Sequence, residues 1–153
     1  NETGRTPIGV VDRSIMQSAG AALLEAGISP AALYSEASLI APNPGQVVAW
    51  LDGDTLVVAS PGRPPVVVPV TTLGGAFEFL ASTQAYGPDV LPATLSLQLV
   101  ATSVDWQRQA GELGFLQEHF ASATVQLLPQ GSLPWLASRI EAASPRALLR
   151  TYC

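Results

Sequence analysis

The residues best suited to chemistry in this 153-residue chain are three acids that lie in successive segments between residues 52 and 105. Asp52 follows an apolar run, Glu78 lies in a predicted helix, and Asp105 lies near the start of the next predicted helix. Carboxylates from separate elements can hold two Mg²⁺ ions for phosphodiester hydrolysis. However, Asp52 falls in a turn past its strand, and the seven arginines are scattered, so no clustered basic surface can bind a nucleic acid. A nuclease is therefore the least favoured of the functions considered.

A second candidate is the turn Asp52-Gly53-Asp54-Thr55, whose backbone N–H groups could cradle a phosphate. Asp-Gly between two β-branched runs is also typical of a type I′ hairpin turn, in which both central residues need positive φ. We favour that structural interpretation, since neither G-x-x-x-x-G-K-[ST] nor G-x-G-x-x-G occurs. Gly74-Gly75 could face a phosphate at a helix N-terminus, but we expect these glycines to serve packing.

The chain has one histidine, His119, and one cysteine, Cys153. His119 has no second His or Cys at ligand spacing, so these residues exclude a zinc site. A Ser-His-Asp triad would have to use His119, and no G-x-S-x-G is present. We expect His119 to be solvated near a helix C-terminus, where its positive form suits the helix dipole. The sequence thus predicts no catalytic residue, no metal and no cofactor.

The composition describes a folded domain with an unusually neutral surface. Apolar residues make up 48% of the chain, charged residues 12%, and the net charge is −5. Charged residues are about half as frequent as in an average protein, so we expect a partner or further chain to cover part of the surface. No apolar stretch reaches the length of a membrane span. Because the chain begins with Asn1, we expect it to be part of a longer protein.

The stretch from residue 46 to residue 70 predicts three antiparallel strands. Two apolar runs, residues 46–51 and 54–60, are joined by Asp-Gly, and a third run, residues 65–70, follows a Pro/Gly turn. The third strand is flanked by prolines and is predicted to be a sheet edge. Its residues Val66, Val67, Val68 and Val70 are therefore the candidate partner-binding residues, by addition of a partner strand.

Helices and strands alternate after this meander. We predict a helix over 73–82 capped by Thr71 or Thr72, a strand over 94–100, a helix from Ser103 to 120, a strand over 124–128 and a helix from Ser132 to 143. The inner faces of the last two helices are predicted from their helical spacing. They are Trp106, Ala110, Leu113, Leu116 or Gln117 and Phe120, and then Leu133, Leu136, Ile140 and Ala143. Trp50, Trp106 and Trp135 are expected to pack in the core or between subdomains.

The first 43 residues predict a βαβ unit. A strand over 7–11 is followed by a helix over 13–25, capped by Asp12 or Ser14 and ended by Gly27. A short strand over 33–35 and a helical turn over 36–40 come next, and Pro42-Asn43-Pro44-Gly45 marks a boundary. We therefore predict two domains, residues 1–43 and 44–153.

The order β-β-β-α-β-α-β-α is that of a ribonuclease-H-like domain and of each half of the actin-like ATPases. The predicted fold class is therefore α/β, a ribonuclease-H-like or actin-like subdomain with a mixed sheet and helices. It is preceded by a partial βαβ unit that forms the tail of another actin-like subdomain.

The amino-acid sequences of several segments resemble the cytoplasmic domain of protein L of the bacterial type II secretion system. Val10-Val11-Asp12-Arg13 followed by Ala26-Gly27-Ile28-Ser29-Pro30 is similar to that family's "VVDR … AGL-P" segment, and Leu33-Tyr34-Ser35-Glu36-Ala37 to the short strand ending in Glu. Trp50 lies near its Trp-bearing strand. Leu133-Pro134-Trp135-Leu136-Ala137 and Ala147-Leu148-Leu149-Arg150-Thr151-Tyr152 resemble the stretch before its membrane helix. There, Ala147, Arg150 and Thr151 replace the family's Asn, Gln and Gly.

This resemblance implies a non-catalytic scaffold that recruits the secretion ATPase to the inner membrane. The implied partners are the amino-terminal domain of that ATPase and other inner-membrane secretion components, with no nucleic acid. It implies a location at the cytoplasmic face of the bacterial inner membrane, with membrane contact only through a segment outside this chain. A homodimer is left open. The alternative is an actin-like nucleotide-binding assembly protein of the pilus-assembly type.

Overall fold

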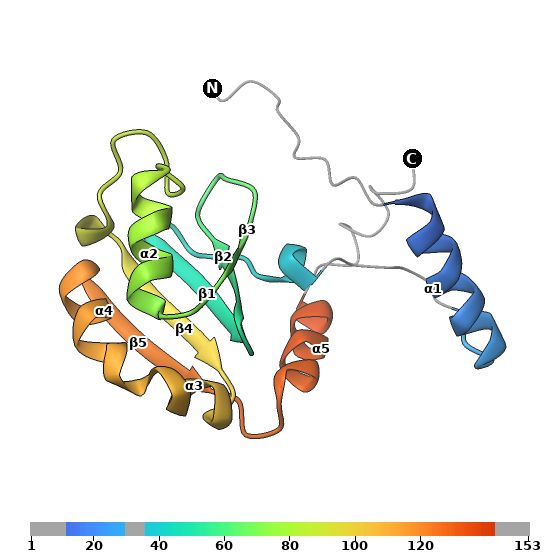
Figure 1. Ribbon diagram of the computed structural model, residues 1–153. Coiled ribbons are helices and arrows are strands. Elements are labelled where there is room, and N and C mark those ends of the chain that lie inside the picture. The colour runs from blue at the N-terminus through green and yellow to red at the C-terminus, as the bar shows by residue number, and fades with distance from the viewer. Residues whose placement is uncertain (1–11, 30–35, 143–153) are drawn as a thin grey trace. The chain divides into compact units, whose positions relative to one another are not determined.

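The computed structural model describes residues 12–29 and 36–142, and the chain divides into two compact units, residues 1–34 and 35–153 (Figure 1). The strands predicted over 7–11 and 33–35, and the βαβ unit they would form, lie outside the described residues. The predicted domain division after residue 43 stays a prediction. No helix within the described ranges is long and apolar enough to cross a membrane.

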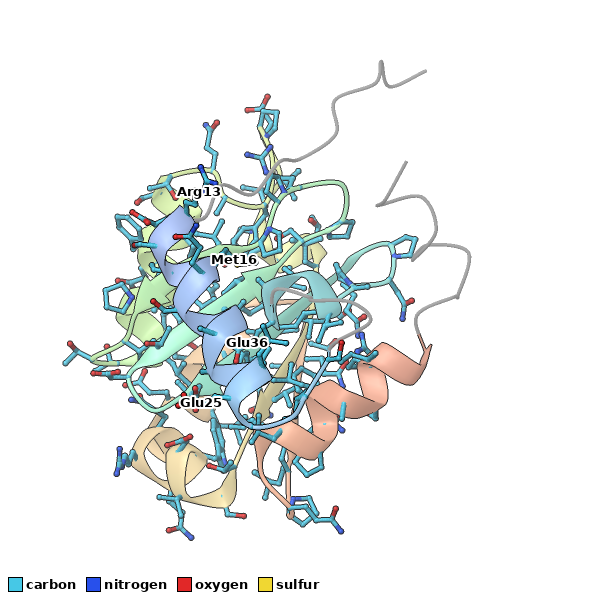
Figure 2. The ribbon with its side chains drawn as sticks, turned by 90° about the vertical axis from the view of Figure 1, so that its right-hand side faces the viewer. Arg13, Met16, Glu25 and Glu36 are labelled. Carbon is cyan, nitrogen blue, oxygen red and sulfur yellow. The ribbon has the colours of Figure 1, made fainter. Side chains whose placement is uncertain are left out.

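The first unit contains helix α1, Arg13–Glu25, with the bounds predicted from the sequence. Asp12 caps it, since its carboxylate accepts from both the backbone N–H (2.7 Å) and the hydroxyl (2.6 Å) of Ser14, and these bonds lower the pKa of Asp12. At the other end Gly27 has a φ of 76°, and the N–H of Ile28 donates to Leu23 C=O at 2.8 Å. This is a Schellman motif, which satisfies the last carbonyls of the helix. Figure 2 labels Arg13, Met16 and Glu25 along α1.

The second unit is built on one mixed sheet of five strands in the order β3-β2-β1-β4-β5. The strands are β1 Gln46–Asp52, β2 Thr55–Ala59, β3 Val66–Pro69, β4 Ser96–Ala101 and β5 Ser122–Leu127. β1, β2 and β3 form the predicted antiparallel meander, β4 pairs in parallel with β1, and β5 pairs in parallel with β4. The α/β fold class with a mixed sheet and helices is therefore confirmed. β3 and β5 are the two edge strands.

Helices cover both faces of this sheet (Figure 1). The first face packs against α2 Leu73–Ser82, α3 Ser103–Gln109 and α4 Leu113–His119, and the second against the 3-10 helix η1 Glu36–Leu39 and α5 Ser132–Ala142. Because β1 and β2 are buried on both faces, their sequences are continuous apolar runs without polar alternation. The predicted inner face of α2, formed by Leu73, Ala76, Phe77 and Leu80, is confirmed.

The single helix predicted from Ser103 to 120 is wrong in two respects. Thr102 is its N-cap, with Oγ1 accepting from the N–H of Asp105 at 3.3 Å, and the helix is interrupted by the 3-10 segment η3, Ala110–Glu112. Two glycines near the interruption, Gly111 and Gly114, disfavour a continuous α-helix. Leu116 and Phe120 are buried as predicted. Ala110 is exposed, because the interruption rotates it away from the sheet.

Some smaller predictions also need correction. β4 begins at Ser96, after the 3-10 turn η2 Pro92–Thr94, and β5 begins at Ser122. On α5 only Leu136 of the predicted inner face is buried among the described positions, while Leu133 is 77% and Ile140 41% exposed. The second core cluster instead takes Trp135 alongside Leu136, because the indole packs against Trp50.

Candidate functional site

The three acids considered for metal binding are not gathered into one site. Asp52 is exposed at the end of β1, Glu78 is exposed on α2, and Asp105 is half-buried in the first turn of α3. Within residues 12–29 and 36–142, no group of three His, Cys, Asp or Glu side chains is placed to hold a metal ion.

The hairpin turn between β1 and β2 differs from the predicted type I′ turn. Asp52 pairs with Thr55, so the central residues are Gly53 and Asp54. Gly53 has a φ of 59°, whereas Asp54 is not among the described residues with positive φ. Positive φ at the first central position alone is the pattern of a type II′ turn, which requires glycine there. Gly53 therefore serves the turn geometry, as Asp-Gly was expected to do.

The N-terminus of α2, where a phosphate was considered, is occupied by the protein's own side chains. The first three N–H groups of the helix each have an acceptor: Leu73 donates to Gln109 Oε1 at 3.2 Å, Gly74 to Glu112 Oε2 at 3.3 Å, and Gly75 to Thr72 Oγ1 at 3.2 Å. Unsatisfied N–H groups at a helix start attract anions. Here the carboxylate of Glu112 takes the position that an external anion would need.

Gly74 leaves the space that the carboxylate of Glu112 occupies in this arrangement. A Cβ at this position would lie 2.8 Å from Glu112 Oε2 and 3.5 Å from the ring of Phe115. The missing side chain lets the loop after α3 approach the helix backbone. Gln109 adds a second contact between this segment and the start of α2, since its Nε2 donates to Thr71 C=O at 3.1 Å. The interruption at η3 is what brings Gln109 and Glu112 to α2.

The candidate partner-binding strand β3 does lie at a sheet edge, but its valines face different ways. Val68 and Val70 are 5% and 8% exposed and belong to the first core cluster, and Val66 packs against that cluster. Val67 points to the other face and is 59% exposed. Of the four residues, only Val67 offers a partner most of its side chain.

The outer edge of β3 also offers few hydrogen bonds. The N–H of Val70 donates to Asp54 C=O at 2.7 Å, and alternate residues of an antiparallel strand face the same neighbour. Val66 and Val68 therefore bond to β2, and Val67 and Pro69 face outward. Since proline has no N–H, the strand presents one outward donor, that of Val67. Its short length and Pro69 are features that protect sheet edges from strand addition.

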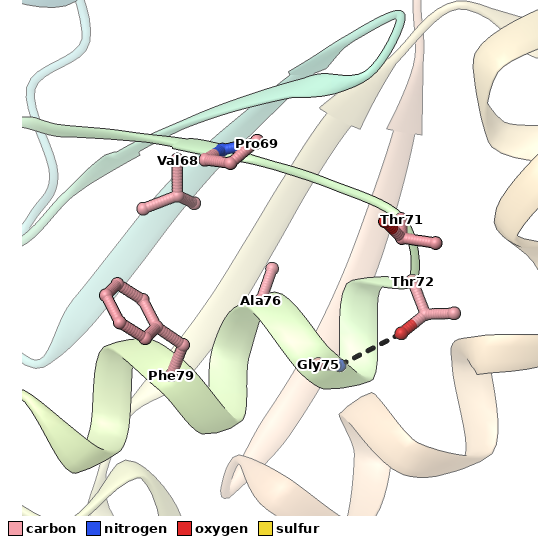
Figure 3. Close-up of a pocket in the computed structure, with 7 residues that line it drawn as sticks. All are labelled: Val68, Pro69, Thr71, Thr72, Gly75, Ala76 and Phe79. Atoms are coloured by element: carbon pink, nitrogen blue, oxygen red, sulfur yellow. Dashed lines mark hydrogen bonds between the residues drawn. The ribbon is translucent and has the colours of Figure 1, made fainter.

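A groove of about 320 Å³ lies between β3 and α2 (Figure 3). It is lined by Val68, Pro69, Thr71, Thr72, Gly75, Ala76 and Phe79. Phe79 is 57% exposed, although α2 is otherwise buried along its inner side. The groove is thus mostly apolar, with two threonines at one end. Sequence reasoning missed it, because Phe79 lies outside the inner face of α2.

The tryptophans are packing residues, as expected. Trp50 is 2% exposed, donates from Nε1 to Ser132 Oγ at 3.1 Å and lies 6.2 Å from the ring of Trp135. Arg139 lies 5.9 Å from the Trp135 ring and donates to Leu39 C=O at 3.2 Å. These contacts hold α5 and η1 against the second face of the sheet. Trp106 packs against the first core cluster.

The prediction that His119 is solvated is wrong. Its ring stacks on Phe115 at 5.0 Å and meets Phe120 edge-on at 5.1 Å, and its Nε2 is buried. Desolvation lowers the pKa of His119, although the nearby carboxylate of Glu78 acts in the opposite direction. His119 lies at the C-terminus of α4, but the helix dipole there does not offset the effect of burial on its pKa.

Comparison of the chain with protein-family models, curated proteins and solved structures finds no match in any of the three.

Proposed function

We propose that the protein is a non-catalytic scaffold that binds a partner protein in the groove between β3 and α2. The partner we propose is the amino-terminal domain of the secretion ATPase of a type II secretion system. The scaffold would hold it, with other inner-membrane secretion components, at the cytoplasmic face of the bacterial inner membrane. The sequence resemblance to protein L supplies the identity of this partner.

The observed topology supports the finer fold proposal. An antiparallel β1-β2-β3 meander is followed by α2, β4, the α3–α4 pair, β5 and α5. This is the order on which the ribonuclease-H-like and actin-like comparison rests. We therefore propose that residues 44–153 form a subdomain of that class, preceded in residues 1–43 by the end of another.

The groove is the observation that carries the function. Exposed apolar side chains next to a hollow are typical of protein-binding surfaces. Phe79 leaves 57% of its surface exposed. Burying a whole Phe side chain is worth about 1.5–3 kcal/mol, so covering the exposed part of Phe79 would contribute about 1–1.5 kcal/mol. The adjacent helix start, filled by Glu112, favours a protein ligand over an anionic one.

A titration of the protein with the purified amino-terminal domain of the secretion ATPase tests this proposal. We expect a complex, and we expect Phe79→Ser to weaken it about tenfold, the equivalent of about 1.4 kcal/mol. Val67→Ser is the matched control, because Val67 is equally exposed but lies on the other face of the sheet. Absence of a complex, or equal loss in both variants, contradicts the proposal.

The same samples separate this function from nucleotide binding. A nucleotide that binds only the folded protein, present at about 100 times its dissociation constant, adds about 2.7 kcal/mol of stability. We expect ATP with Mg²⁺ to leave the melting temperature unchanged. A rise would favour the actin-like assembly protein of the pilus-assembly type.

A further inference from the structure

The two edges of the sheet are built differently. β3 has four residues and ends in Pro69, whereas β5, Ser122–Leu127, has six residues with neither proline nor charge. Proteins usually protect an edge strand with prolines, charges or short length, because its free backbone groups pair with other strands. β5 has none of these protections. Its outer edge is therefore suited to pairing with another strand.

The chain around β5 is also free of charge. From Phe120 to Ser138 there is no Asp, Glu, Lys or Arg, although the protein carries a net charge of −5. Two copies of an acidic protein repel each other, so contact between them is favoured where charges are absent. Within this stretch Leu127 is 45% exposed.

A chain of glutamines crosses the second face of the sheet and ends on β5. Asn43 donates its backbone N–H to Gln46 Oε1 at 3.1 Å, which leaves Gln46 Nε2 to donate to Gln98 Oε1 at 3.4 Å. Gln98 Nε2 in turn donates to Gln126 Oε1 at 2.6 Å. A backbone N–H can only donate, so it fixes the orientation of all three amides. In the part of the chain that the structure describes, the NH₂ group of Gln126 has no acceptor.

From these three features we propose that β5 pairs antiparallel with β5 of a second copy across a two-fold axis. The two sheets of five strands would then form one continuous sheet. A two-fold interface requires a surface that is complementary to itself. β5 meets this requirement, because Thr124 and Gln126 lie on one face and Ala123 and Val125 pack on the other.

The register follows from matching the faces. In an antiparallel pair, side chains that lie directly opposite each other point to the same face of the sheet. Even-numbered residues of one β5 must therefore lie opposite even-numbered residues of the other. The two such registers with the greatest overlap of the six-residue strands place Gln126 opposite Thr124 or Ser122 of the other copy. In either register its free amide donors meet a hydroxyl acceptor, and like charges do not meet. Because β5 is complementary to itself, a second copy is favoured over an unrelated strand. The inference does not depend on the proposed ATPase partner.

The test measures mass by light scattering and sedimentation from about 1 to 100 µM, a range that covers dimers of micromolar affinity. We expect the protein to approach twice its monomer mass of 15.9 kDa. The double variants Thr124→Lys/Gln126→Lys and Thr124→Glu/Gln126→Glu should each be monomeric, because like charges then oppose each other in both registers. Mixing the two variants should restore a dimer.

Val67→Lys on the other edge is the matched control and should leave the dimer intact. Cooperative thermal unfolding confirms that each variant is folded, and Thr124→Arg/Gln126→Arg or Thr124→Asp/Gln126→Asp replaces a double variant that is not. A monomeric wild type at the highest concentration overturns the proposal. So does a mixture that stays monomeric, or a Val67→Lys variant that dissociates the dimer.

Discussion

Replacing Glu112 by alanine should destabilise the start of α2 by about 1–1.5 kcal/mol. Its carboxylate accepts from the N–H of Gly74 at 3.3 Å. Hydrogen bonds to charged groups contribute about 1.5–3 kcal/mol, and an anion near a helix N-terminus about 0.3–1 kcal/mol. Because this bond is long and Glu112 is only half-buried, we expect a total somewhat below the sum of these two ranges.

Gly74→Ala should disturb the same contact between Glu112 and Gly74 by changing the second residue. The new Cβ would lie 2.8 Å from Glu112 Oε2 and would displace the carboxylate. The lost interaction, about 1 kcal/mol, is offset by the higher helix propensity of alanine, also about 1 kcal/mol. We therefore expect little net change in the wild-type background. In the Glu112→Ala background the clash is absent, so Gly74→Ala should stabilise the protein.

Urea unfolding of the four proteins, followed by tryptophan fluorescence, gives the coupling between the two positions. We expect a coupling free energy of about 1 kcal/mol, whereas independent sites add within about 0.5 kcal/mol. Glu118→Ala, at an exposed position on α4, is the control and should change stability by less than about 0.5 kcal/mol. Additive effects of the two substitutions would refute the reasoning that Glu112 occupies the start of α2.

Three further outcomes follow from buried contacts. Ser132→Ala should cost about 1–2 kcal/mol in urea unfolding, because the buried indole N–H of Trp50 loses its acceptor, and Ser132→Thr should restore most of it. Leu136→Ala should cost about 2–4 kcal/mol in the same assay, since Leu136 is 6% exposed in the second core. Burial lowers the pKa of His119 below 6.5, so the unfolded chain binds a proton first on acidification. The free energy of unfolding should fall as the pH drops through about 6.5 towards the folded-state pKa of His119. His119→Phe should remove the part of this fall that His119 causes. If the variant and the wild type lose stability equally over this pH range, the prediction is contradicted.

Local features of the fold could be predicted from the sequence because they depend on neighbouring residues. The bounds of α1 and α2 follow from Asp12, Thr72 and Gly27, which satisfy the helix ends within a few residues. The β1–β2 hairpin follows from two apolar runs with a glycine between them. The edge position of β3 follows from its prolines.

The candidate surfaces could not be predicted in the same way, because distant segments make them. Glu112 lies 38 residues after Gly74, and only the packing of α2 beside η3 brings them together. Gln46 and Gln98 lie 52 residues apart and meet because β4 inserts next to β1.

The sequence by itself therefore determined where most of the described helices and strands lie, and that three of the strands form a meander. Capping, turn geometry and apolar periodicity act over a few residues, so they can be read along the chain. The tertiary structure alone decided that β5 became the second edge, that a carboxylate filled the start of α2, and that Phe79 was left exposed beside β3. Those outcomes depend on the free energy of packing whole elements together, which no local pattern of residues contains.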